Sequence, residues 1–267
     1  MTREAFVRLL RQTGRTLDVI QRWMRFKITA SPLNPWRIQS LNASAFAGKK
    51  VIIIGPAQTV VEDLENVVVD GYDVIVRLNN GIALARKNPS ILGSRTDVLF
   101  HNLVEHGDRS AGAIPASLLR EHGVRFLVFP HWGFKGSKSR LYKKREELQG
   151  FQGPALMVPS TRFCESVRRE LGGFQPTVGA SAILFFLSAQ CKEVAIHGFT
   201  FFQTPYLVGY NDAVATADEA RAWAAASYVH DPVREKKVIG RYISAAEQRG
   251  VRVGLGANVR RFLSDVR

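Results

Sequence analysis

The pattern of apolar residues changes near residue 50, where short segments rich in valine and isoleucine begin to alternate with longer segments of helical spacing. The predicted strands are 51–54, 73–78, 97–100, 125–129, 155–158, 193–197 and 252–255. The predicted helices are 58–68, 114–122, 138–149, 161–171, 178–190, 214–229, 232–249 and 257–265. Strands without polar alternation, each bounded by helices, indicate a mostly parallel sheet covered on both faces. We therefore predict one Rossmann-like α/β domain over residues 41–267, with ligands at the carboxyl ends of its strands.

Residues 1–40 are predicted to form a basic arm in front of this domain. Within it, residues 2–28 place apolar side chains at helical spacing and many arginines between them, against two acids, Glu4 and Asp18. Such a helix suits an anionic membrane surface. A helix packed on the domain with its arginines in solvent fits equally well, and an Arg-rich, acid-poor presequence is a third interpretation. The segment 31–35, with two prolines, is predicted to be a linker.

The composition adds a large positive charge, since 37 Lys and Arg stand against 23 Asp and Glu, for a formal net charge of +14. Such a chain attracts polyanions, anionic lipid surfaces or phosphorylated ligands, and charge alone does not choose among them. A nucleic-acid-binding protein is the least favoured class, because the sequence contains no recognised module and no RNP-like aromatic pattern.

The cysteine count and the lengths of the apolar segments bear on the cellular compartment. Two cysteines, Cys164 and Cys191, are too few for a disulfide scaffold and favour a reducing environment. No apolar segment is long enough to span a membrane, and arginines interrupt each place where a signal h-region could lie. We therefore expect a cytoplasmic protein that can associate peripherally with the inner face of the cytoplasmic membrane.

Small and amide side chains follow several of the predicted strands. The first strand runs into Gly55, and a glycine at a strand-to-helix turn lets backbone amides approach a phosphate, although many such glycines serve packing alone. The G-x-G-x-x-G pattern is missing, which disfavours a dinucleotide. Asn79 and Asn80 end the second strand and Asn102 follows the third, where amides can bind a ligand. Asn79-Asn80-Gly81 is also a good turn sequence, and by itself the turn is the favoured interpretation.

Two helix starts carry further candidate residues. Thr177 precedes a long apolar helix and can cap it, while the small residues beside it would let a ligand lie against exposed amides or simply allow close packing. His230 stands at the entrance of a helix whose first residue is predicted to be Pro232. A neutral imidazole there can accept a hydroxyl proton near pH 7, and Glu235 can bind backbone amides or orient the loop. A single histidine is more often structural.

Three common ligand-binding patterns are missing. The sequence contains no D-x-D triplet to hold a divalent metal on a sugar nucleotide, no Cys/His cluster with zinc spacing and no Walker A loop. We therefore predict no metal site and no cofactor.

Taken in order, these segments resemble the sialyltransferases of glycosyltransferase family 29. Segments 51–55 and 74–79 are similar to the large motif, 93–96 to G-[ST]-[KR]-T, 176–179 with 191–199 to the small motif, and 230–235 to H-x-x-x-x-E. Segment 198–203 is also similar to the bacterial sialyltransferases of family 42. The similarity covers about residues 50–240, and the ordered set is far more specific than any one member.

The resemblance implies an inverting, metal-independent glycosyltransferase. It would move an acidic keto-sugar, sialic acid or Kdo, from its CMP-activated form to a hydroxyl of a glycan or glycolipid acceptor. His230 would be the general base and Glu235 its structural support. Together with the neighbouring Pro56, Ala57 and Asn80, the residues expected around the nucleotide are Gly55, Asn79, Asn102, Thr177, Val178, Gly179, Gly198 and Phe199. The basic arm and a second basic cluster over 135–145 favour a lipid-linked acceptor of the lipopolysaccharide or capsule type.

The sequence departs from the family pattern at three places. Pro56 replaces an asparagine, no cysteine near Val51 can pair with Cys191, and the histidine-tyrosine motif is missing. Family 42 uses tyrosines of this region to hold the leaving phosphate, so Tyr206 and Tyr210 are the candidates for that role. A catalytically inactive nucleotide-binding homologue is the alternative that these departures favour.

Overall fold

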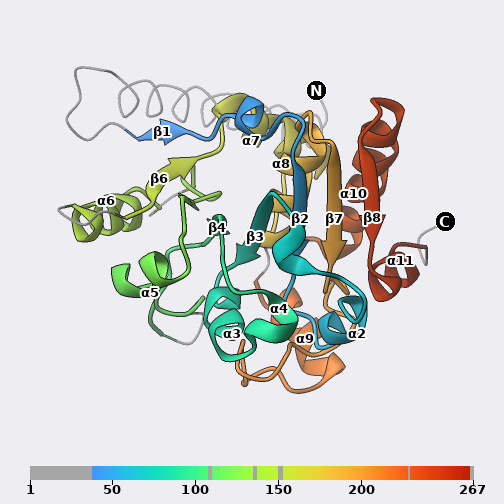
Figure 1. The fold of residues 1–267 in the computed structure, drawn as a ribbon, viewed down its shortest axis with the longest axis horizontal. Coiled ribbons are helices and arrows are strands. Elements are labelled where there is room, and N and C mark those ends of the chain that lie inside the picture. Colours follow the sequence, from blue (N-terminus) through green and yellow to red (C-terminus); the bar gives the residue numbers. More distant parts are fainter. Residues whose placement is uncertain (1–37, 108–109, 135–136, 150–152, 228, 265–267) are drawn as a thin grey trace, which may run out of the picture.

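The computed structural model describes residues 38–107, 110–134, 137–149, 153–227 and 229–264, so the predicted helix at 2–28 lies outside the described residues. Its sheet has the order β1-β6-β5-β4-β3-β2-β7-β8, and each pairing within it is parallel. The strands are β1 Gln39–Ser40, β2 Lys50–Ile54, β3 Val74–Leu78, β4 Val98–Phe100, β5 Phe126–Val128, β6 Ala155–Val158, β7 Glu193–His197 and β8 Arg252–Leu255. Figure 1 shows them side by side from β1 to β8. The predicted α/β fold with a parallel sheet is confirmed.

All seven predicted strands are present, and the structure adds β1. Residues 39 and 40, which the boundary at 40 assigned to the arm, pair with β6. The helices are α2 Val60–Asp63, α3 Gly81–Lys87, α4 Pro89–Leu92, α5 Ala116–Glu121, α6 Ser137–Leu148, α7 Thr161–Glu170, α8 Val178–Ser188, α9 Ala217–Ala225, α10 Pro232–Gln248 and α11 Ala257–Ser264. Short 3₁₀ helices occupy Ala43–Phe46 and Val69–Gly71. Helices α3 and α4 were not predicted, because Gly81 ends an Asn-Asn-Gly turn sequence and the helix that begins at Pro89 has only four residues.

The strand order places a crevice between β2 and β7. From β2 the chain proceeds outward through β3, β4, β5 and β6, and it then returns across the sheet to pair β7 with the free side of β2. The connections leaving the carboxyl ends of β2 and β7 therefore run to opposite sides. In open parallel sheets, ligands bind outside the strands at such a reversal.

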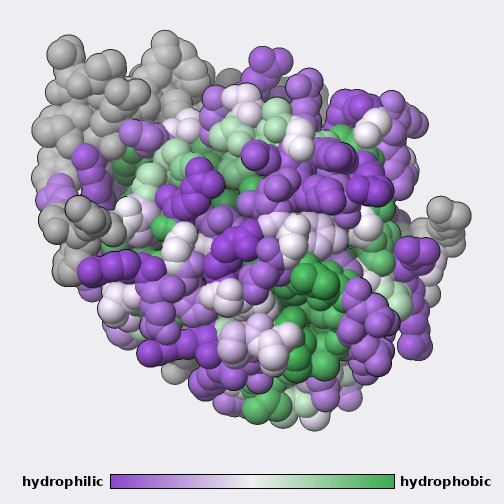
Figure 2. All heavy atoms as spheres, in the orientation of Figure 1, coloured by the Kyte–Doolittle hydropathy of each residue, from purple (hydrophilic) through white to green (hydrophobic). Residues whose placement is uncertain are grey.

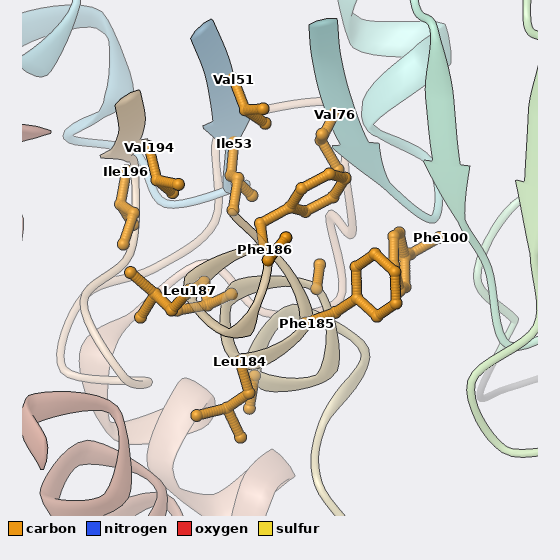
Figure 3. Packing of buried hydrophobic residues seen from close by; sticks show 14 of the residues in the cluster. Val51, Ile53, Val76, Phe100, Leu184, Phe185, Phe186, Leu187, Val194 and Ile196 are labelled. Atoms are coloured by element: carbon orange, nitrogen blue, oxygen red, sulfur yellow. The ribbon is translucent and has the colours of Figure 1, made fainter. Parts of the chain in front are cut away.

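Helices cover both faces of the sheet, which explains why its strands do not alternate with polar residues. Val51 and Ile53 of β2 face one apolar cluster, and the intervening Ile52 faces another. The first cluster contains nearly all of α8, which packs between the sheet and α10. Figure 3 shows Phe186 of α8 pointing toward Ile53, and its neighbours reaching β4 and β7. Because α8 is held on both sides, its N-terminus has a fixed position at the edge of the sheet.

The opposite face is covered by α2, α3 and α4 around Ile52 and Ile75. Figure 2 shows a hydrophobic area on the outside of the molecule where α2 and α4 lie, and these helices carry the exposed side chains of Val61 and Ile91. Hydrophilic side chains dominate the same view around α10 and β8. In the described part of the chain, no helix is both long enough and apolar enough to cross a membrane.

Candidate functional site

A pocket lies at the carboxyl ends of β2, β3 and β7, at the predicted edge of the sheet. It is walled by segments that follow these three strands, by the start of α8 and by α10. Its lining residues are Pro56, Ala57, Leu78, Asn79, Thr177, Val178, Gly179, Ala180, Ile183, Gly198, Phe199, Thr200, Phe201, Phe202, Thr204, Tyr206, Tyr210, Glu235 and Ile239. Most residues expected around a nucleotide are therefore brought together. Gly55, Asn80, Asn102 and His230 lie outside the lining itself.

The glycines beside this pocket are required by the close approach of two backbones. A Cβ on Gly55 would lie 2.3 Å from the carbonyl oxygen of Gly198, and a Cβ on Gly198 would lie 2.6 Å from the carbonyl oxygen of Gly55. Gly198 also has φ +71°, in the left-handed region. A Cβ on Gly179 would lie 2.9 Å from the ring of Phe199. Backbone packing thus explains why positions 55 and 198 are glycine, and Gly55 lies behind the wall that Pro56 and Ala57 form.

Asn79 connects the ends of β3 and β4 to the loop that contains Tyr206 and Tyr210. Its Oδ1 accepts a hydrogen bond from the Asn102 amide at 3.2 Å, and its Nδ2 donates to the Tyr210 hydroxyl at 3.4 Å. Its φ of +47° is left-handed, a conformation that asparagine tolerates better than most residues. Asn80 supports the same loop from outside the pocket, donating at 3.0 Å to the carbonyls of Gly209 and Tyr210. Asn102 and Asn80 therefore contact the pocket through other residues.

Two tyrosines and two strained phenylalanines form the aromatic side of the pocket. The Tyr206 and Tyr210 rings are 5.0 Å apart between centroids. Desolvation raises the pKa of Tyr210 to about 12 and that of Tyr206 further, so both phenols are protonated donors at neutral pH. Phe201 and Phe202 are consecutive non-glycine residues with φ +53° and +63°. Such backbone conformations cost about 1–3 kcal/mol each and cluster at ligand sites. These phenylalanines were missed as site residues, although segment 198–203 had been singled out.

Glu235 ties the start of α10 to the start of α8. Its Oε1 accepts a hydrogen bond from the Thr177 amide at 2.6 Å, and its Oε2 accepts one from the Thr177 hydroxyl at 2.9 Å. The Thr177 hydroxyl in turn accepts from the Ala180 amide and so caps α8. Burial of Glu235 raises its pKa to about 8, although both hydrogen bonds from Thr177 oppose the shift.

His230 lies in the loop that enters α10, half-buried, beside the segment 175–177. Asp231 caps the helix and Pro232 is its first residue, as predicted. The ring nitrogen Nδ1 of His230 is 2.7 Å from the carbonyl oxygen of Gln175. A carbonyl oxygen only accepts, so Nδ1 carries the proton and the lone pair of the neutral imidazole is on Nε2. The Gln175 amide also donates to the carbonyl of Val229 at 2.8 Å, which fixes the two loops against each other.

A second histidine, His131, packs against the first. It follows β5, its ring centroid lies 6.2 Å from that of His230, and its Nε2 donates to the carbonyl of Pro176 at 2.9 Å. Burial and the neighbouring His230 lower the pKa of His131 to about 3, so it stays neutral. His131 was not predicted as a site residue, although, like Asn102, it is a polar residue that follows a strand.

The predicted basic patch over 135–145 is partly occupied by internal contacts. Lys135 lies outside the described residues, and Lys144 is buried against Glu105 and Glu147. Arg140 donates to the carbonyl of Asn102 at 2.9 Å and lies over the ring of Phe129. Expecting Lys144 to face an acceptor or a membrane was therefore wrong, because its side chain is buried and its ammonium group is held by two carboxylates of the same protein. Among the described residues, no three His, Cys, Asp or Glu side chains gather as metal ligands.

Comparison with known proteins gives similarities at the level of structure. No family model matches the chain, and no curated protein matches it. The chain is similar to the crystal structure of a mammalian sialyltransferase in complex with Gal-β-1-3GalNAc-ortho-nitrophenol, with TM-score 0.49 and 16% identity over 90% of this chain and 86% of that chain. It is similar to a further crystal structure of a mammalian sialyltransferase, with TM-score 0.48 and 16% identity over 90% and 85% of the two chains. At this identity, the roles of individual residues must be judged from their own geometry.

Proposed function

We propose that this chain is an inverting, metal-independent glycosyltransferase. Its donor is a CMP-activated acidic keto-sugar of the sialic acid or Kdo type, and its acceptor is a hydroxyl of a glycan or glycolipid. The observation that carries the proposal is the position of His230. Its Nδ1 is bound to Gln175, two residues before Thr177, which lines the pocket at the switch point of the sheet. The resemblance of the ordered sequence segments to the motifs of family 29 supports CMP as the nucleotide.

The proposed reaction needs a base on one side of the anomeric carbon and stabilisation of the leaving phosphate on the other. The acceptor oxygen forms the new bond, and the bond from the anomeric carbon to the phosphate oxygen breaks, releasing CMP. Nε2 of His230 takes the acceptor proton, a contribution typically of about 10²–10⁴-fold in rate. The first N–H groups of α8 at Val178 and Gly179, which have no intrahelical partner, meet the negative charge that grows on the phosphate.

Tyr206 and Tyr210 are proposed to assist the same leaving group. Both line the pocket, and both phenols keep their protons at neutral pH. Glu235 is proposed to be a positioning residue, because it holds Thr177 and thereby the start of α8. We further propose a cytoplasmic protein whose residues 1–40 contact an anionic membrane surface, which suits a glycolipid acceptor.

A substitution at His230 tests the proposal. Wild type is expected to be stabilised against heat by CMP, since a ligand that binds the native state raises its apparent stability. It is also expected to release CMP from CMP-sialic acid or CMP-Kdo. His230→Ala should bind CMP with unchanged affinity and lose about 10²–10⁴-fold in turnover. Binding of CMP without turnover by wild type would indicate the inactive homologue, and undiminished turnover by His230→Ala would refute the role of His230.

A further inference from the structure

The proposed donor brings two negative charges into the pocket, one on its phosphodiester and one on the carboxylate of the sugar. No Lys, Arg or His is among the described residues that line this pocket, and Glu235 is the only acid. Helix amides and phenols can serve the phosphate, as proposed above. A carboxylate in a half-enclosed, largely apolar site still needs its own partner, because an unpaired charge taken out of water is costly.

The course of α10 past the pocket brings one cation close to the wall. Glu235 and Ile239, four residues apart, face the pocket. The next stripe of the helix, with Lys236 and Gly240, faces a separate groove beside β8 and α11. Lys236 nevertheless returns toward the pocket, because its Nζ lies 6.0 Å from the ring centroid of Phe201, which lines the wall.

The charge of Lys236 is available for a ligand. Its side chain is half-buried, and no carboxylate in the described part of the chain lies within ion-pair distance of its Nζ. Arg234 and Arg241, on the same helix, are instead bound to Asp231 and Glu170. The ammonium group therefore rests on the face of an aromatic ring, an arrangement that a carboxylate can readily replace or extend.

We propose that Lys236 binds the carboxylate of the donor sugar and thereby selects acidic sugars over neutral ones. This inference rests on the proposed function, since it assumes a CMP-linked acidic sugar in the pocket. Phe201 holds the lysine at the wall, and the strained backbone at residues 201 and 202 fixes the ring in place. Lys236 acts on binding and specificity, while proton transfer remains with His230.

The test compares two probes that differ only at the carboxylate, CMP-sialic acid and its carboxyl methyl ester. Dissociation constants are measured by calorimetry in the His230→Ala protein, which should not consume the donor, and in the same protein with Lys236→Gln or either of two control substitutions added. Lys237→Gln removes the next, exposed lysine of the same helix. Lys87→Gln removes a lysine beside Gly209, the neighbour of Tyr210. Melting temperatures establish that each variant is folded, as expected because all three lysines have solvent-accessible side chains.

The protein that retains Lys236 should bind the acid about tenfold more tightly than the ester, the size expected for a partly exposed charged contact. Lys236→Gln should lose this preference while binding CMP within about twofold of wild type, and both controls should keep it. An unchanged preference in Lys236→Gln, or a preference lost in Lys87→Gln instead, would overturn the inference. Failure of wild type to bind CMP at all would sink the proposed function itself, so the two failures are distinguishable.

Discussion

The buried carboxyl group of Glu235 makes a specific prediction about how stability depends on pH. Its pKa in the native protein is raised to about 8, against 4.5 for an ordinary glutamate. Between these values the native state keeps the proton while the unfolded chain releases it. The stabilisation from the protonated group is therefore complete below about pH 4.5 and is lost as pH rises through about 8. Each pH unit in this window lowers the free energy of unfolding by about 1.4 kcal/mol, which amounts to about 3 kcal/mol from pH 5.5 to 7.5.

Glu235→Gln separates this group from all others that titrate. A glutamine has the shape of the protonated acid, so its carbonyl can accept from the Thr177 amide and its NH₂ can donate to the Thr177 hydroxyl, which takes the place of the two existing hydrogen bonds. At pH 5.5 the variant should lie within about 1 kcal/mol of wild type. Since glutamine does not titrate, it should gain about 3 kcal/mol relative to wild type by pH 7.5.

Urea unfolding at 25 °C and pH 5.5, 6.5 and 7.5 measures the difference between the two proteins at each pH. Glu247→Gln, an exposed glutamate near the end of the same helix, is the matched control and should follow wild type. Parallel curves for wild type and Glu235→Gln, differing by a constant amount across the three pH values, would refute the reasoning. That result would mean that the carboxylate is ionised in the folded protein and that the Thr177 hydrogen bonds outweigh burial.

Two further substitutions test the walls of the pocket. Gly55→Ala should destabilise the protein by about 2–3 kcal/mol, because its Cβ would meet the Gly198 carbonyl at 2.3 Å. Gly240→Ala is the control: nothing lies within 4 Å of its Cβ, so it should be neutral or stabilising by up to about 1 kcal/mol. Thermal melts compare the two variants. Tyr210→Phe should change stability by less than about 1 kcal/mol, since the hydrogen bond between the Tyr210 hydroxyl and Asn79 is long. If the phenol stabilises the leaving phosphate, the variant should lower kcat about 10- to 100-fold in the CMP-release assay. An unchanged kcat would show that Tyr210 does not have that role.

The sheet could be predicted from sequence because its strands are buried on both faces. Val51, Ile52, Ile53 and Ile54 lie in a continuous apolar run, and the structure sends alternate members of this run into opposite layers. Helices α3 and α4 could not be predicted in the same way, because both are short and begin at Gly81 and Pro89, residues that occur in turns as well as at helix starts. Ile82, Leu84 and Leu92 of these two helices are all buried, so it is packing against the sheet that stabilises such short helices.

The site was harder to predict, because its contacts join residues that are far apart in sequence. His230 is tied to Gln175 and Glu235 to Thr177, and no local pattern encodes either distance. The sequence also left two interpretations of Gly55 open, and only the 2.3 Å approach to the Gly198 carbonyl favours packing. The neighbours Glu235 and Lys236 show the same limit most clearly. Adjacent residues of a helix point in different directions, so the acid faces the pocket and binds Thr177, whereas the ammonium group of the lysine lies over the ring of Phe201. Which of them meets a ligand's charge is therefore decided by the rotation of α10, a quantity that the buried residues Val238, Ile239 and Ile243 fix against α8 and the sheet.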